Sequence, residues 1–220
     1  MSHQIAIDGP AGAGKSTIAK IVAGKLGFIY VDTGAMYRTM ALYLSRQNVD
    51  PDNMEEIGEK AQSAEITIKY IDGEQVVMLG EENVNGLIRN PEVSAMASKT
   101  SQVARLREKL VELQQKLAQT ENVVMDGRDI GTVVLPNADL KIYLTASVEV
   151  RAQRRYKEMI AKGQEAVLSE IEKDIAERDY RDMHREASPL KQADDAILVD
   201  TSEMSIEEVA DKIIELYNTK

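Results

Sequence analysis

Apolar and polar positions in the first part of the chain alternate between short apolar runs and longer stretches with helical spacing. Residues 4–8 and 28–31 have the composition of buried strands, and residues 15–26 and about 35–46 have the spacing of helices. Strands that alternate with helices in this way pair in parallel through right-handed crossovers. The pattern therefore predicts an α/β fold, with a break at residues 48–53, where turn-forming side chains are concentrated.

The pattern changes between residues 65 and 84. Residues 65–71 alternate apolar and polar positions, Asp72-Gly73 is a strong hairpin-turn dipeptide, and residues 74–79 provide a return strand. A short strand near residues 82–84 could join them. This segment predicts a small antiparallel insertion, because it lacks the helix that another strand–helix unit would need.

Helical and strand patterns return in the remainder of the chain. Apolar spacing predicts helices at residues 91–98, 102–119, 146–162, 165–185 and 205–217. Strands are expected at residues 122–126, 140–144 and 196–199. Ser205 is expected to cap the last helix, with Glu208 completing a capping box. The expected core therefore has five strands, near residues 5, 29, 124, 142 and 198.

Composition narrows the kinds of protein that this chain can be. Its 220 residues are 43% hydrophobic and 29% charged, as in one globular domain. The chain has no cysteine, which excludes disulfides and thiolate metal sites, and its two histidines make a histidine-built zinc site unfavourable. The net charge of −10 predicts no nucleic-acid partner. Without a signal pattern or a membrane-length apolar run, we expect a cytoplasmic protein with no membrane partner. We also expect a monomer.

One contiguous motif carries most of the chemical information. Residues 9–17 fit the pattern Gly-x-x-x-x-Gly-Lys-Ser between an expected strand and an expected helix, the context that a phosphate-binding loop requires. Glycines let backbone amides surround a phosphate, and the helix N-terminus adds a favourable dipole. Lys15 can reach the β- and γ-phosphates of a triphosphate, and Ser16 can bind Mg²⁺. The residues expected to bind ATP are Gly9, Pro10, Ala11, Gly12, Ala13, Gly14, Lys15, Ser16 and Thr17.

Two segments at strand ends could face that triphosphate. Residues 32–38 begin at the carboxyl end of the second strand and place Arg38 one turn into a helix. Residues 126–132 follow the next core strand, where Arg128 lies between Asp126 and Asp129. The arginine suits bidentate phosphate binding, although a plain turn with a structural ion pair would have the same composition.

Two charged helical stretches complete the set. Arg178, Asp182 and Arg185 fall on one face of the expected helix, where they could form a phosphate clamp or a solvated salt-bridge surface. Arg151, Arg154 and Arg155 precede the helix stop at Gly163. Three arginines in such a short stretch suit a mobile lid that closes on the transferring phosphoryl group and excludes water.

Together these segments resemble one family, the bacterial-type cytidylate kinases (CMP/dCMP kinases) among the nucleoside monophosphate kinases. The resemblance rests on residues 7–17, 32–38, 126–134 and 177–182 and on the antiparallel insertion, and it covers nearly the whole chain. It implies a P-loop kinase fold, with a five-stranded parallel sheet flanked by helices. The single domain of residues 1–220 would have a core of 1–47 and 120–220, a monophosphate-binding insertion at about 60–100 and a helical lid at about 151–170.

The resemblance also implies roles for individual residues. The CMP phosphate would be held by Arg38, Arg128 and Arg185, and the cytosine edge would be read by Ser98, Arg107 and Asp129. Arg178 and Asp182 would contact the sugar, and Arg178 could also touch the transferring phosphoryl group. Asp126 would orient arginines or metal-bound water, while Arg154 and Arg155 would act from the lid on ATP. The catalytic residues would be Lys15, Asp126, Arg128, Arg178 and Arg185.

The implied reaction moves the γ-phosphoryl group of ATP, with Mg²⁺, to CMP or dCMP. The residues leave open another small-molecule P-loop kinase with UMP or a non-nucleotide acceptor. A GTPase switch is disfavoured because the sequence contains no Asn-Lys-x-Asp motif. A non-catalytic nucleotide- or nucleic-acid-binding module is disfavoured by the acidic charge and by the content of one Phe and no Trp.

Overall fold

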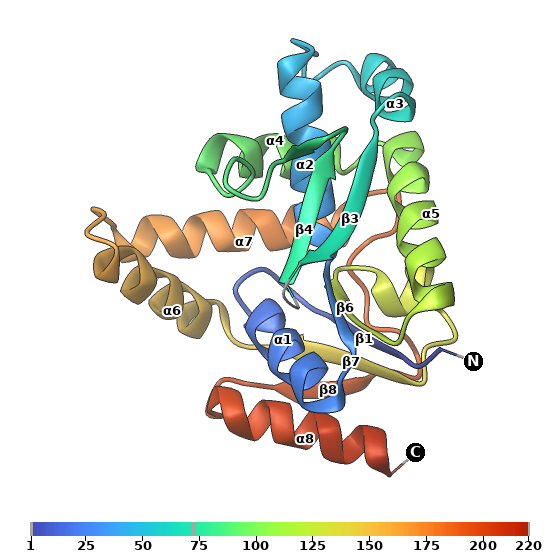
Figure 1. Cartoon of the computed structure of the whole chain (residues 1–220). Helices are drawn as coiled ribbons and strands as arrows, with labels where there is room; N and C mark the ends of the chain where they lie inside the picture. Colours follow the sequence, from blue (N-terminus) through green and yellow to red (C-terminus); the bar gives the residue numbers. More distant parts are fainter. Residues whose placement is uncertain (1, 72–73, 220) are drawn as a thin grey trace.

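A five-stranded parallel sheet lies at the centre of the computed structural model, which describes residues 2–71 and 74–219 (Figure 1). Its strands lie in the order β2-β6-β1-β7-β8. Their bounds are β1 Gln4–Asp8, β2 Ile29–Asp32, β6 Val123–Gly127, β7 Leu140–Thr145 and β8 Ile197–Asp200. The apolar residues 5–7 of β1 and 123–125 of β6 are buried because helices cover both faces of the sheet. All five predicted core strands are confirmed.

Helices pack against both faces of the central sheet. Ile5 and Ile7 of β1 pack with α1 (Lys15–Leu26) and α8 (Ile206–Asn218), while Ala6 between them packs with α5 (Ala104–Thr120) and with the π-helix η1 (Ile130–Val134). This alternation places the four elements on opposite sides of the same strand. Ser205 caps α8, and Glu208 completes the predicted capping box.

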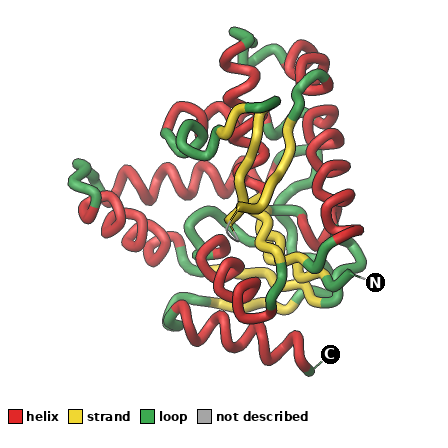
Figure 2. The backbone as a smooth tube through the Cα atoms, in the orientation of Figure 1, coloured by secondary structure: helices red, strands yellow, loops and turns green. Residues whose placement is uncertain are grey.

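A second apolar core lies beyond the β2 edge of the sheet. It joins α2 (Thr33–Arg46), α3 (Met54–Gln62), α4 (Pro91–Thr100) and part of α5 to the small antiparallel sheet. That sheet consists of β3 (Ile66–Ile71), β4 (Glu74–Leu79) and β5 (Glu82–Asn83), as the alternating pattern predicts. The predicted hairpin turn at 72–73 lies outside the described residues. In Figures 1 and 2 the small sheet stands over the end of β2.

The helices α6 (Val148–Ala161) and α7 (Leu168–His184) form a pair that projects from the body of the molecule (Figure 2). They pack on each other through a small cluster around Ala152, Ile171 and Ile175. Gly163 ends the first helix region with a φ of +70°, as predicted. The pair therefore has its own apolar contact and is joined to the sheet at its two ends.

Three local features differ from the prediction. Helix α3 was not predicted, although Asn53 caps it by accepting from the Glu56 amide at 3.1 Å, a recognisable start signal. The π-helix η1 was not predicted either. Arg185 is the residue after the end of α7, with extended backbone (φ −66°, ψ 142°), so it does not share a helix face with Arg178 and Asp182.

Candidate active site

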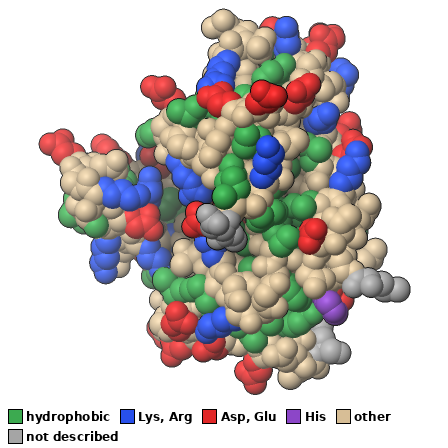
Figure 3. Space-filling view, viewed as in Figure 1, with side chains coloured by type: hydrophobic (Ala, Val, Ile, Leu, Met, Phe, Trp, Pro, Cys, Tyr) green, Lys and Arg blue, Asp and Glu red, His purple; other side chains and the backbone are tan. Residues whose placement is uncertain are grey.

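A cavity of about 870 Å³ runs along the carboxyl ends of β1, β2 and β6. Parallel pairing brings these ends together, since Asp8 lies opposite Gly127 and Asp32 lies opposite Asp126. The cavity extends from the 9–17 loop to α4 on one side and to α6, α7 and the start of α8 on the other. Lys and Arg side chains are visible along the α6–α7 pair and beside it (Figure 3).

The loop of residues 9–17 has the conformation that its glycines predict. Gly12 and Gly14 have φ of +78° and +85°, and a Cβ on Gly9 would lie 1.9 Å from the Leu144 carbonyl oxygen. Only glycine fits there, because the loop crosses the β7 backbone at contact distance. Lys15 is buried and donates from Nζ to the Pro10 carbonyl at 2.7 Å. Burial lowers its pKa, and nearby Arg128 lowers it further.

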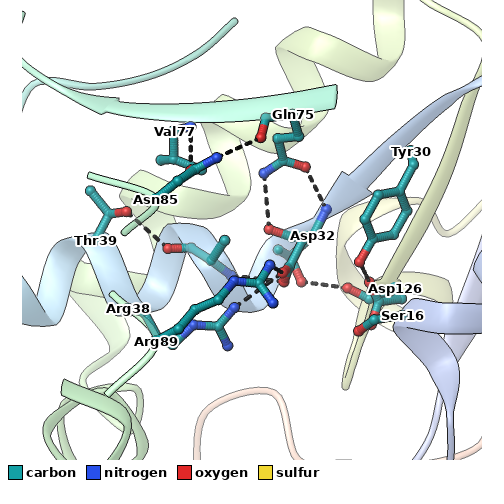
Figure 4. A network of polar contacts seen from close by, with 12 residues as sticks. Ser16, Tyr30, Asp32, Arg38, Thr39, Gln75, Val77, Asn85, Arg89 and Asp126 are labelled. Atoms are coloured by element: carbon teal, nitrogen blue, oxygen red, sulfur yellow. Dashed lines mark hydrogen bonds and ion pairs between the residues drawn. The ribbon is translucent and has the colours of Figure 1, made fainter. Parts of the chain in front are cut away.

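Asp126 lies directly beside this loop. Ser16 Oγ donates to Asp126 Oδ2 at 3.0 Å, and Tyr30 Oη donates to Asp126 Oδ1 at 2.8 Å (Figure 4). Burial raises the pKa of Asp126, and the neighbouring Asp32 carboxylate raises it further. Among residues 2–71 and 74–219, no group of three or more His, Asp or Glu side chains is arranged to hold a metal ion.

Asp8 connects the loop strand to the opposite side of the cavity. Its carboxylate accepts from the amides of Ile130 at 2.8 Å and Gly131 at 2.7 Å. These amides begin the π-helix and directly follow Arg128 and Asp129. Burial raises the pKa of Asp8 to about 6, although the two amide hydrogen bonds act in the opposite direction. Sequence reasoning gave Asp8 no role, because its partners lie more than a hundred residues away.

Four arginines line the middle of the cavity, namely Arg38, Arg128, Arg178 and Arg185. Arg128 Nε donates to Asp182 Oδ2 at 2.9 Å. Arg178 lies in the same charged group, and burial together with Arg128 lowers its pKa to about 10. The Nε atoms of Arg38 and Arg178 and the Arg185 Nη2 are buried without a hydrogen-bond partner. Such donors fit an anionic ligand, because a buried donor atom without a hydrogen-bond partner is costly.

The far end of the cavity is built around Asp129. Arg107 Nη2 donates to Asp129 Oδ2 at 2.6 Å and Nη1 donates to the Ser101 carbonyl at 2.9 Å. Arg185 Nη2 lies 3.7 Å from Asp129 Oδ1. The Arg107 guanidinium also lies over the ring of Tyr37, 5.1 Å from its centroid. Asp129 is thus a fixed, buried acceptor with one oxygen turned to a weaker ion pair.

The basic residues of α6 divide into three kinds. Arg151 is buried, donates to the Ala11 carbonyl at 2.9 Å and pairs with Asp179 at 2.7 Å, so it is a structural residue and not a free arginine of a mobile lid. Arg154 lines the cavity and donates to the Thr201 hydroxyl and carbonyl. Arg155 pairs with Glu158 and does not line the cavity, whereas Lys157 does.

The structure thus brings most predicted site residues to one cavity. Besides Arg154 and the four arginines at its middle, the predicted residues that line it are Ala11, Gly12, Ala13, Gly14, Lys15, Ser16, Thr17, Ser98, Arg107, Asp126, Asp129 and Asp182. Gly9, Pro10 and Arg155 do not line the cavity. Tyr37 and a group after β8, including Thr201 and Ile206, line the cavity without having been predicted. No described helix is long and apolar enough to cross a membrane.

Solved structures share this fold at low sequence identity. A shikimate kinase from Bacteroides thetaiotaomicron is 18% identical, with a TM-score of 0.52 over 98% of each chain. An uncharacterized protein from Eubacterium ventriosum is 12% identical, with a TM-score of 0.55 over the whole of both chains. These likenesses support the P-loop kinase fold.

Comparison with known sequences identifies the family. Curated cytidylate kinases from Caldicellulosiruptor bescii and Lactobacillus johnsonii are 51% and 50% identical to this chain, over 97% and 99% of its length and 94% of theirs. The family model described as cytidylate kinase matches residues 5–219. With the motif residues gathered in one cavity and the match running along almost the entire sequence, the chain belongs to the cytidylate kinase family.

Proposed function

We propose that this protein transfers the γ-phosphoryl group of ATP to CMP or dCMP, giving ADP and CDP or dCDP. Family membership supports the activity. The observation that carries the assignment of residues is a single cavity that joins a phosphate-binding loop, four arginines and the Asp129–Arg107 pair. We place the enzyme in the cytoplasm, where ATP and nucleoside monophosphates are available.

The donor side would be formed by residues 9–17. Backbone amides of the loop and the N-terminus of α1 would bind the ATP phosphates. Lys15 would exchange its bond with the Pro10 carbonyl for a phosphate oxygen. Ser16, held at Asp126, would bind Mg²⁺. When bound, the metal neutralises phosphate charge and aligns the triphosphate. Arg154 would reach the same ATP from α6, and Arg155 could do so only if α6 moved.

The acceptor side would be formed by the arginines. Arg38, Arg128 and Arg185 would hold the CMP phosphate, and Arg178 and Asp182 would contact the sugar. Arg178 could also reach the transferring group, because it lies beside Arg128 in the charged cluster. Their buried donors without partners would then be satisfied by phosphate oxygens.

The reaction needs little acid–base chemistry. A CMP phosphate oxygen attacks the γ-phosphorus of ATP, a new P–O bond forms, and the bond to the β-phosphate oxygen breaks. The attacking oxygen is already anionic, so no strong base is required. Lys15 and the arginines lower the barrier by holding both phosphates in line and by neutralising the charge on the transferring group. Asp126 keeps Ser16 and its surroundings in place.

Cytosine would be recognised by Asp129, Arg107 and Ser98. The exocyclic amine of cytosine donates a hydrogen bond, and Asp129 Oδ1 is a buried acceptor whose other oxygen is occupied by Arg107. Uracil has a carbonyl at that position and would face the carboxylate without a donor. The site would therefore favour CMP over UMP.

Residues of about 151–170, which cover most of α6 and the start of α7, would act as the lid. The segment of about 60–100 would act as the monophosphate-binding insertion. Closure would exclude water, which is the competing acceptor of the phosphoryl group. Because Arg151 ties α6 to the Ala11 carbonyl, movement would be confined to the part of the pair beyond this residue.

The test is ADP release by the purified protein with Mg-ATP and a panel of acceptors: CMP, dCMP, UMP, AMP, GMP and shikimate. We expect fast turnover with CMP and dCMP, slow turnover with UMP and negligible turnover with the others. Faster turnover with UMP or shikimate would support a different small-molecule kinase. ATP binding without turnover on any acceptor would contradict the proposed acceptor site.

A further inference from the structure

Arg38 is held by a network that begins outside the cavity, on the small antiparallel sheet (Figure 4). Its Nη2 atom pairs with Asp32 Oδ2 at 3.0 Å. The same carboxylate caps α2, because Asp32 Oδ1 accepts from the Ala35 amide at 2.8 Å. Asp32 therefore fixes both the start of α2 and the position of the Arg38 guanidinium.

Asp32 is in turn held by Gln75 of β4. The Gln75 side-chain amide bonds both backbone groups of Asp32, since Oε1 accepts from the Asp32 amide at 2.7 Å and Nε2 donates to the Asp32 carbonyl at 3.3 Å. These two bonds resemble one rung of a β-ladder, with a side chain in place of the neighbouring strand. Asp32 is the last residue of edge strand β2, so both backbone groups face the insertion.

Two further residues of the insertion, Asn85 and Arg89, support Gln75 and Asp32. Asn85 accepts from the Val77 amide at 3.0 Å and donates to the Gln75 carbonyl at 2.9 Å, which holds the backbone of β4 near Gln75. The Arg89 guanidinium reaches Asp32 Oδ2 at 3.3 Å from the segment after β5, with its side chain 64% exposed. The insertion thus contacts Asp32 at its backbone through Gln75 and at its carboxylate through Arg89.

The absence of a side chain at Gly34 leaves the space that Arg38 needs to reach Asp32. A Cβ on Gly34 would lie 3.1 Å from Arg38 Nη1 and 3.2 Å from Asp32 Oδ1. Glycine at this position lets Arg38 fold back onto Asp32. Nε of Arg38 is buried without a hydrogen-bond partner and Arg38 lines the cavity, so the pairing leaves a donor for a ligand.

We propose that Gln75 is a positioning residue that sets the place of Arg38 through Asp32 and so couples the insertion to acceptor binding. This inference rests on the proposed function, because it treats Arg38 as a contact of the acceptor phosphate. Gln75 does not line the cavity and touches no substrate in this scheme. Its loss would displace Arg38 and weaken acceptor binding, while the donor loop would keep its own supports in β1 and β7.

The experiment compares Gln75→Ala, Arg38→Ala and the double variant by steady-state kinetics with CMP and ATP. Loss of both hydrogen bonds releases Asp32 and with it Arg38, so Gln75→Ala should raise KM for CMP about tenfold. KM for ATP should change less than about twofold. In the Arg38→Ala background, the Gln75 substitution should raise KM for CMP by less than about a further twofold. The effects of two substitutions are not additive when one residue acts through the other.

Gln62→Ala is the matched control. The Gln62 side chain also bonds backbone carbonyls, those of Gly58 and Arg105, but it does so between α3 and α5, away from the cavity. It should change stability without changing KM for CMP. Gln75→Met, which keeps the side-chain volume, should reproduce the kinetic effect of Gln75→Ala with less effect on packing.

Any of three kinetic outcomes would overturn the inference: an unchanged KM for CMP in both Gln75 variants, an equal rise in KM for ATP, or an undiminished effect in the Arg38→Ala background. Loss of the folded state in both variants would also overturn it, since Gln75 would then be a structural residue only. A wild-type protein that fails to phosphorylate CMP would instead contradict the proposed function, so the two failures are distinguishable.

Discussion

At the scale of single residues, the position of Lys15 indicates its role most directly. It is buried at the phosphate loop, and its ammonium is satisfied by a loop carbonyl that a phosphate oxygen can replace. Local sequence sufficed to predict it, because every residue of the loop is contiguous.

We expect Lys15→Ala to lower kcat with CMP about 10²- to 10³-fold, as for loss of one preorganised group that stabilises transition-state charge. Lys25→Ala removes a lysine at the other end of the same helix, where it pairs with Glu207 and Asp211, and should leave kcat unchanged. Single-turnover assays would check both. A loss below tenfold for Lys15→Ala would remove this lysine from the catalytic residues.

Asp129 should determine the choice between CMP and UMP. Asp129→Asn keeps the size of the side chain and adds a donor that can meet the uracil carbonyl. The CMP/UMP ratio of kcat/KM should therefore fall at least about tenfold, or ~1.4 kcal/mol. Asp52→Asn, at an exposed ion pair with Lys99, is the control. A ratio equal to that of the wild type would contradict the assignment.

Asp8 should make stability depend on pH. Its pKa is raised to about 6 in the folded protein, above the usual value of 3.8, so the folded state holds this proton more tightly. The resulting stabilisation is full below about pH 4 and is lost as the pH rises through 6. The free energy of unfolding of the wild type, relative to Asp8→Asn, should fall by up to ~3 kcal/mol between pH 4 and pH 7.

Urea unfolding of wild type and Asp8→Asn across this pH range would measure the difference, and carbon NMR of the Asp8 carboxyl group would give its pKa directly. If the stability of the wild type relative to Asp8→Asn rises with pH instead, the two amide hydrogen bonds lower the pKa of Asp8 more than burial raises it. The position of Asp8 next to the loop was visible in the sequence, but its partners depend on how β1 and β6 pair.

At the scale of elements, the predicted strands and most helices follow from burial patterns that the sequence displays. β1 and β6 each contain three consecutive buried apolar residues, 5–7 and 123–125, which is typical of central strands of a parallel sheet. Helix α3 could have been predicted from Asn53 and Glu56. The π-helix could not, because its first amides are satisfied by the Asp8 carboxylate from another part of the chain.

Two glycines at the ends of one strand–helix unit should respond oppositely to alanine. A Cβ on Gly24 of α1 meets nothing within 4 Å, so Gly24→Ala should stabilise the protein by about 0.5–1 kcal/mol. A Cβ on Gly9 would overlap the Leu144 carbonyl oxygen, and Gly9→Ala should cost at least about 2 kcal/mol or prevent folding. Thermal unfolding measures both. Equal midpoints would contradict this account of the loop.

At the scale of the whole molecule, the sequence predicted which segments meet but not how they are held. The acceptor residues come from α2, α4, α5 and α7, from the segment that follows β6 and from Arg185 beyond the end of α7. Strand order predicted that the segments after β2 and β6 meet, and the family resemblance implied the others. Arg151 illustrates the limit. As one of three nearby arginines it suited a mobile lid, yet the fold places the Ala11 carbonyl and the Asp179 carboxylate around it.

The protein should be a monomer in solution. Its exposed large apolar side chains are spread over separate elements, such as Met54 on α3, Ile160 on α6 and Leu198 on β8. The net charge of −10 adds repulsion between copies. Light scattering after size exclusion should give one species of 24.4 kDa, with and without ATP and CMP. A species of twice this mass would contradict the prediction.

The contact between the small sheet and β2 has a consequence for solubility. β2 is an outer strand of the central sheet, and its free backbone groups could template pairing with another protein molecule. Tyr70 donates to the Tyr30 carbonyl at 3.2 Å, and Gln75 occupies the amide and carbonyl of Asp32. Side chains of the insertion thus occupy backbone groups of the β2 edge that another strand would otherwise bind. This should reduce edge-to-edge aggregation of the protein.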